Sequence, residues 1–229
     1  MNYLIPPVED GIYKKWSEGH IYQGFGESKE LYRNALSSAN YDFIGGHNGI
    51  DIAPPRNPSK RKNYIVGTEG TVVDVKDTPN GYGKHVRILT DVDTEGNQLE
   101  ITYGHLSEIF VPLGYRVKDH EVIAQMGNSG FIVSGGVPYW GNAPAGKGVH
   151  LHCTIRECSA FGGKWQTVYP NGLSTFVKNY DNGTRGAVDP IPYLRFESTE
   201  GLLARLLAML KLTNKLYFEF TKLKGRNST

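Results

Sequence analysis

Six short segments of the chain are rich in apolar and β-branched residues and are separated by polar, turn-forming stretches. Val72-Val73-Asp74-Val75 and Val86-Arg87-Ile88-Leu89 are typical. Such composition, together with apolar residues recurring at every second position, is typical of strands that bury one face. We therefore expect strands near residues 64–66, 70–76, 84–90, 98–104, 121–126 and 149–156.

Glycine and tyrosine are frequent, with 28 and 14 residues in a chain of 229. Many glycines between short strand-like runs predict a mainly β fold with long loops. The length is enough for one sizeable domain and some extra chain. We place this domain at residues 22–197, after an irregular N-terminal arm at 1–21.

The C-terminal segment has a different pattern. Leucine, methionine and phenylalanine recur at helical spacing between Thr199 and Lys224, and Gly225 could end the helix. Residues 198–229 are therefore expected to form an amphipathic helix. Its wide apolar face requires a partner surface. Packing onto the main domain, docking to another subunit or a larger assembly such as a phage tail, and membrane-surface binding all remain open.

The net charge is only +2, so the composition gives no reason to expect nucleic-acid binding. No segment reaches the roughly 18 uninterrupted apolar residues that a membrane span requires.

The two cysteines are expected to be free thiols. Cys153 and Cys158 are five residues apart in an extended run, about 16 Å, which is too far for a disulfide. They are weak alternative candidates for zinc ligation.

Two segments carry the chemistry. His47-Asn48-Gly49-Ile50-Asp51 and His150-Leu151-His152 together supply three imidazoles and one carboxylate, which are zinc-ligand types. His150 and His152 share one face of a strand, because side chains alternate along it. His47 and Asp51 would lie roughly 13 Å apart in extended chain, so a bend at Asn48-Gly49 must bring them together.

A catalytic zinc needs three protein ligands and one open position, which leaves one imidazole as a candidate general base. Among the other histidines, His105 follows a strand-like run and is expected at a strand end, where catalytic side chains are often presented. The remaining three, His20, His85 and His120, lie among polar neighbours and are expected at the surface.

These motifs, together with Gly-Thr-Glu-Gly-Thr-Val at 67–72, Gly-Tyr-Gly-Lys-His-Val at 81–86, Tyr-Gly-His-Leu at 103–106 and Gly-Asn-Ser-Gly at 127–130, resemble the lysostaphin/LytM-type zinc endopeptidases that cut peptidoglycan. The resemblance implies an antiparallel β-sheet peptidase domain. It implies that His47, Asp51 and His152 bind Zn²⁺, that His150 is the general base, and that His105 orients water or stabilises the oxyanion. The 131–149 loop is longer than usual in the family and is expected to border the cleft.

The implied function is hydrolysis of peptide cross-links in bacterial peptidoglycan. A non-catalytic wall-binding or regulatory module, or a structural virion component, is the alternative on the same fold. No secretory signal is visible at residues 1–10. Action at the cell wall as a phage virion or lysis protein, or export by another route, is therefore expected.

Overall fold

The computed structural model describes residues 21–31, 45–54 and 64–194. They contain fourteen strands and one 3₁₀ helix, Ile191–Tyr193, and residues 29–31 are helical. The strands, in chain order, are β1 (Ile21–Gln23), β2 (Ile50–Ile52), β3 (Tyr64–Val66), β4 (Gly70–Thr78), β5 (Gly83–Leu89), β6 (Asn97–Ile109), β7 (Arg116–Val117), β8 (Val122–Met126), β9 (Ile132–Ser134), β10 (Val137–Tyr139), β11 (Leu151–Ser159), β12 (Trp165–Val168), β13 (Ser174–Val177) and β14 (Ala187–Val188).

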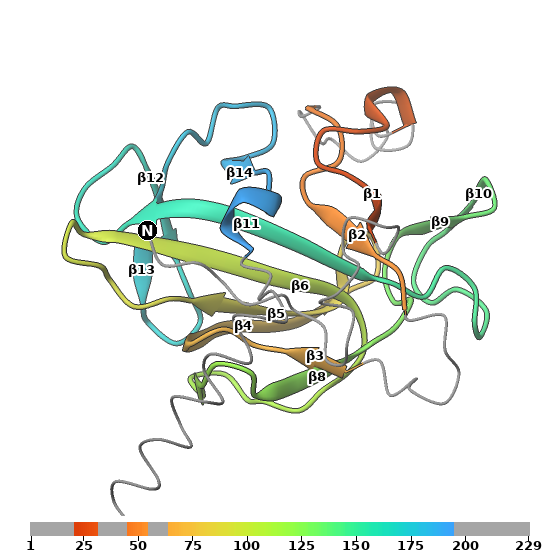
Figure 1. The fold of residues 1–229 in the computed structure, drawn as a ribbon, viewed down its shortest axis with the longest axis horizontal. Coiled ribbons are helices and arrows are strands. Elements are labelled where there is room, and N and C mark those ends of the chain that lie inside the picture. The colour runs from red at the N-terminus through yellow and green to blue at the C-terminus, as the bar shows by residue number, and fades with distance from the viewer. Residues whose placement is uncertain (1–20, 32–44, 55–63, 195–229) are drawn as a thin grey trace, which may run out of the picture. The chain divides into compact units, whose positions relative to one another are not determined.

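Twelve strands form one sheet, whose central path runs β1-β2-β11-β6-β5-β4-β7 (Figure 1). Each of these neighbouring pairs is antiparallel. β3 joins the sheet through β8, which pairs with β6, while β12, β13 and β14 extend it around β11. The mainly β, antiparallel fold expected from the sequence is confirmed.

The central strands have one apolar and one polar face. Leu151, Cys153 and Ile155 of β11 are at most 1% exposed and pack in the core with Ile101 and Tyr103 of β6. The opposite face carries polar side chains at positions that are paired across the strands. They are His152, Thr154 and Arg156 of β11, Thr102 and Glu100 of β6, His85 and Arg87 of β5, and Asp74 and Lys76 of β4.

All six expected strands are present, with bounds within a few residues of the predicted ones except that β6 continues to Ile109. The sequence did not predict the short strands β1, β7, β9 and β10, nor β12, β13 and β14 within residues 159–190. The expected N-terminal arm, apart from Ile21, and the C-terminal helix lie outside the described residues. Within the described part of the chain, no helix is long and apolar enough to cross a membrane.

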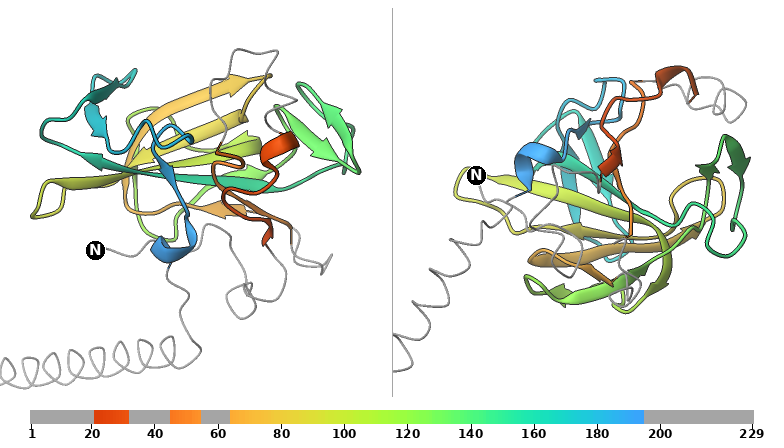
Figure 2. Two further views of the ribbon diagram at one scale, coloured as in Figure 1. Left: turned by 90° about the horizontal axis from the view of Figure 1, so that it is seen from above. Right: turned by 45° about the vertical axis from the view of Figure 1, so that its right-hand side comes forward.

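The two ends of the sheet differ. Figures 1 and 2 show the β9–β10 hairpin and the β1–β2 segment at one end, and the β12–β13 hairpin at the other. The histidines singled out from the sequence belong to the first end, because β2 and the start of β11 meet there.

Candidate metal centre

Strand pairing brings the two ligand segments together. β2 and β11 are antiparallel neighbours, and Asp51 is the direct register partner of His152. The chain bends at Asn48-Gly49, as expected, and returns His47 to the same point. Gly49 is required there because a Cβ atom would lie 2.4 Å from the Cys153 carbonyl oxygen and 2.9 Å from the His152 ring.

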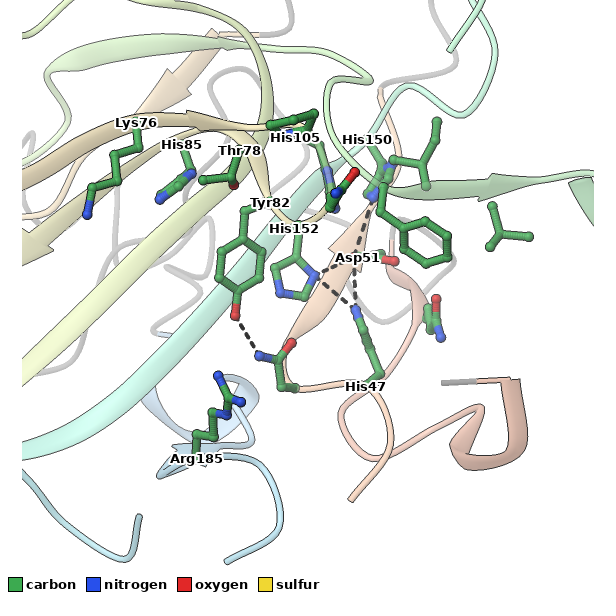
Figure 3. A pocket seen from close by; sticks show the side chains of 18 of the residues that line it. His47, Asp51, Lys76, Thr78, Tyr82, His85, His105, His150, His152 and Arg185 are labelled. Atoms are coloured by element: carbon green, nitrogen blue, oxygen red, sulfur yellow. Dashed lines mark hydrogen bonds and ion pairs between the residues drawn. The ribbon is translucent and has the colours of Figure 1, made fainter. Parts of the chain in front are cut away.

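Three ligand atoms form a small triangle. His47 Nε2 lies 2.9 Å from His152 Nδ1 and 3.1 Å from Asp51 Oδ1, and His152 Nδ1 lies 2.9 Å from the same carboxylate oxygen. Figure 3 shows the three side chains pointing toward one another. All three residues are at most 4% exposed, so they lie at the base of the site.

The outer ring nitrogens of both histidines are held by hydrogen bonds. His47 Nδ1 donates to the Gly24 carbonyl oxygen at 3.0 Å, and His152 Nε2 lies 2.7 Å from the Thr154 hydroxyl. A carbonyl can only accept, so His47 carries its proton on Nδ1 and presents the Nε2 lone pair inward. Metal-binding histidines in proteins are oriented by partners of this kind.

The protonation states also suit a cation. Burial would raise the pKa of the Asp51 carboxyl, but His150, His152 and His47 facing it hold that pKa well below its usual value. Burial lowers the pKa of His152 to about 4, against the raising effect of Asp51. At neutral pH Asp51 is therefore ionised and His152 is neutral, as metal coordination requires.

The donor set fits zinc. Tetrahedral zinc with ligands at about 2.0–2.1 Å needs ligand atoms about 3.3 Å apart, and the three sides of the triangle are 2.9–3.1 Å. Two imidazole nitrogens and one carboxylate oxygen are also the set expected where a fourth position stays open. Among the described residues, these three form the one group of histidine, cysteine or carboxylate side chains close enough to share an ion.

His150 and His105 lie beside the triad. His150 Nε2 is 3.7 Å from Asp51 Oδ1, and the ring centroids of His105 and His150 are 4.6 Å apart. His150 Nδ1 donates to the Gly148 carbonyl at 2.6 Å, and His105 Nδ1 donates to the Ser129 carbonyl at 2.7 Å. In their neutral forms both rings therefore have an unprotonated Nε2.

The sequence suggested that His105 lies at a strand end, and this prediction is wrong. The residue lies within β6 at a bulge, where Gly104 and His105 together face the single residue His85 of β5. Its φ of 59° is in the left-handed region, which is uncommon for a residue other than glycine. Bulges next to active sites redirect side chains, and this one turns His105 toward His150. Burial holds the pKa of His105 well below its usual value.

His85 belongs to the cleft, although its polar neighbours in the sequence did not indicate this. It was expected at the surface, but it is 2% exposed and its ring packs edge-on against Tyr82. A signal was present in β5, because His85 and Arg87 alternate with the buried residues Val86 and Ile88. His120 is exposed, as expected, and His20 lies outside the described residues.

The triad opens into a cleft of about 510 Å³. Tyr82 stacks on His152 with a ring-centroid distance of 5.1 Å, and its hydroxyl accepts a hydrogen bond from Asn48. Figure 3 shows Tyr82 between the triad and the side chains of His85 and Lys76. Phe131, Ile132 and Val133 also line the cleft, so the 131–149 segment borders it as predicted.

Solved structures with related folds include LytU (26% identity, TM-score 0.44, 76% of this chain and 83% of that one). A second is a mutant of the catalytic domain of the prophage-encoded M23 protein EnpA from Enterococcus faecalis, with 22% identity and a TM-score of 0.43 over 82% of this chain and 96% of that one. A third is a zinc-containing peptidase from Vibrio cholerae, with 19% identity and a TM-score of 0.46 over 83% of this chain and 40% of that one. The chain thus spans less than half of the Vibrio protein. No curated protein sequence matches this one.

Residues 45–170 match the sequence profile of Peptidase family M23. This region is more than half of the chain, and it contains both ligand-bearing segments and the strands that bring them together. The chain therefore belongs to Peptidase family M23, as a metallopeptidase whose zinc ligands are His47, Asp51 and His152.

Proposed function

We propose that this protein is an endopeptidase that hydrolyses peptide cross-links of bacterial peptidoglycan. The observation that carries the proposal is the placement of a three-ligand metal site beside two further imidazoles at the base of an open cleft. Such a cleft can admit an extended peptide, and the family's lysostaphin/LytM-type members supply the substrate class. A module without catalysis would have no need of this complete set.

When bound, zinc polarises a carbonyl group and lowers the pKa of a coordinated water. The chain's own residues then have to hold this water, remove its proton and keep the peptide in line. His47, Asp51 and His152 fix the position of the ion, and their partners Gly24 and Thr154 fix the ring orientations.

His150 is the proposed general base. Its Nδ1 is committed to the Gly148 carbonyl, which leaves Nε2 to accept a proton, and Nε2 lies 3.7 Å from the triad carboxylate. An imidazole suits this step because its usual pKa lies near neutral pH. The same nitrogen can later donate the proton to the leaving amine.

His105 is proposed to orient the water. The sequence resemblance left open whether it orients water or donates to the oxyanion. The hydrogen bond from Nδ1 to the Ser129 carbonyl and the lowered pKa both favour a neutral ring whose Nε2 accepts a hydrogen bond. Oxyanion stabilisation by His105 would need a protonated ring, which its burial disfavours.

The test is digestion of purified sacculi by the zinc-loaded protein, with and without chelator, followed by mass spectrometry of the new termini. We expect new amino and carboxyl ends at a cross-link, and none with chelator present. Intact sacculi after treatment with zinc-loaded, folded protein would contradict the proposal.

We also propose a phage virion or lysis context for this activity. The domain limits 22–197, and a homo-oligomer or tail assembly formed through the C-terminal helix at 198–229, are proposals as well. Deleting residues 199–229 and measuring the mass in solution tests the assembly role, because an unchanged oligomeric state would count against it.

A further inference from the structure

The cleft continues away from the triad along the polar face of the sheet. Beyond Tyr82 it is lined by His85 and Arg87 of β5, Asp74 and Lys76 of β4, and Arg156 of β11. Arg87 is the register partner of Asp74 on one side and of Thr102 on the other. The proposed hydrolytic step uses none of these charged side chains.

Three buried atoms in this part of the cleft lack a hydrogen-bond partner among the described residues. They are Asp74 Oδ1, Arg87 Nε and Arg156 Nε. The Asp74 side chain is only 3% exposed, and the Arg87 and Arg156 side chains are 21% and 13% exposed. Buried polar groups without partners are costly, and their occurrence in a native protein calls for an explanation.

Three other atoms of these groups, Asp74 Oδ2, Arg87 Nη1 and Arg156 Nη1, already have charged partners. Asp74 Oδ2 lies 3.0 Å from Lys76 Nζ and 3.9 Å from Arg87 Nη1. Arg156 Nη1 donates to Glu100 at 3.2 Å, and the second oxygen of Glu100 accepts from the Tyr169 hydroxyl at 2.5 Å. These contacts orient the side chains, and the buried atoms left without a partner are one acceptor and two donors.

A ligand that satisfies all three atoms must donate to a carboxylate and accept from two guanidinium groups. We propose that this end of the cleft binds a substrate group that carries a free ammonium and a free carboxylate on one carbon atom. The ammonium pairs with Asp74, and the carboxylate pairs with Arg87 and Arg156. This proposal rests on the proposed function, and it names the substrate feature that the same cleft selects.

A charged ligand group fits better than a neutral peptide amide. An amide also offers a donor and an acceptor, but hydrogen bonds between ionised partners are about twice as strong as neutral ones. The charges here also lie in a largely buried environment, where Coulomb interactions are less screened than in water. A zwitterionic group adds no net charge to the cleft.

The subsite lies at a definite distance from the metal centre. Arg156 follows His152 by four residues on β11, about 13 Å along the strand. Arg87 is level with Thr154, across β6. The zwitterionic group thus belongs two or more residues from the reacting bond, or at the end of a long side chain closer to it.

Three cross-linked stem-peptide dimers test the proposal. They differ at the residue before the cross-link: meso-diaminopimelate with its free ammonium and carboxylate, the same residue with that carboxylate amidated, and L-lysine, which has no such carboxylate. We expect kcat/KM to fall by about tenfold or more for the second and third dimers, mainly through KM.

Substitutions test which side chain binds each charged group of the ligand. Asp74→Asn and Arg87→Gln should reduce kcat/KM for the first dimer by a similar factor, and Arg87→Gln should reduce the difference between the first and second dimers. The same chemical changes at exposed ion pairs outside this cleft, Asp181→Asn and Arg116→Gln, are the matched controls. Should the buried variants unfold, the kcat/KM values of the unaltered protein for the three dimers still test the proposal.

Calorimetric binding of free meso-diaminopimelate separates this proposal from the hydrolytic one. Binding that Asp74→Asn abolishes, without cleavage of any dimer, would support the subsite and contradict the peptidase proposal. Equal cleavage of all three dimers would overturn the subsite and leave the peptidase proposal standing. Neither binding nor cleavage would contradict both.

Discussion

At the scale of single residues, the five side chains of the centre should divide into two groups. Replacing His47, Asp51 or His152 by alanine removes a ligand atom, so we expect zinc content to fall from about one ion per chain to near zero. His150→Ala and His105→Ala should retain zinc but lose turnover by about 10²- to 10⁴-fold, the usual contribution of a positioned acid or base. Elemental analysis of purified variants, alongside rates, checks the division.

His120→Ala provides the matched control, because that histidine is exposed and does not line the cleft. It should keep both zinc and activity. Loss of zinc from the His150 variant would mean that His150 is a ligand, and the assignment of roles would then be wrong.

The two cysteines allow a prediction about pH. Burial raises the pKa of both Cys153 and Cys158 to about 12, so at pH 8 only about one thiol in 10⁴ is ionised. We expect no alkylation by iodoacetamide at pH 8 in the folded protein, and two modified thiols after denaturation. Reactivity should rise only as the pH approaches 12, and rapid modification of the folded protein at pH 8 would contradict the burial.

A residue of the site can be predicted from the sequence only when it acts through its side chain. Spacing pointed to the pairs His47/Asp51 and His150/His152 as candidate ligands, while the choice among them and the role of His105 came from the family resemblance. The support of His47 was not predictable, since Gly24 acts through its backbone carbonyl, which any residue would provide. Thr154 could have been found, because it is two residues after His152 and therefore on the same strand face.

At the scale of elements, the close contact between β2 and β11 determines the geometry of the centre. Gly49→Ala would place a methyl group 2.4 Å from the Cys153 carbonyl oxygen and 2.9 Å from the His152 ring. The strands must then separate, which moves Asp51 away from His152. We expect a loss of about 1–3 kcal/mol in stability and weaker zinc binding, measured by thermal unfolding and by competition with a metal indicator.

Gly81→Ala serves as the comparison, because its added Cβ would meet only the Thr78 side chain, at an ordinary 3.4 Å. It should cost no stability. Equal effects of the two substitutions would show that the loss comes from glycine's backbone freedom rather than from the strand contact.

Strand prediction succeeded and failed for one physical reason. β4, β5, β6 and β11 bury most of their apolar side chains, so the pattern of apolar positions is visible in the sequence. β7, β9, β12 and β14 have only two to four residues and are partly exposed. Pairing with another strand, rather than their own side-chain pattern, decides their conformation. The bulge at His105 is likewise set by its neighbours, because β6 changes partner there from β11 to β8.

At the scale of the whole molecule, the metal joins parts of the chain that lie far apart in the sequence. Asp51 and His152 are separated by 101 positions, and zinc can bind all three ligands only when β2 and β11 are paired. Binding that requires the folded state stabilises it by RT ln(1 + [L]/Kd), about 2.7 kcal/mol when free zinc is one hundred times Kd. Chelation should therefore lower the melting temperature of the unaltered protein by several degrees.

The same chelation experiment on His152→Ala tells whether this stabilisation comes from the triad. That variant cannot close the ligand set, so its melting temperature should be low already and should not respond to chelator. A shift of equal size in the variant would place the stabilising metal elsewhere in the chain. With no shift in either protein, zinc would not be acting as a link between the two ligand segments.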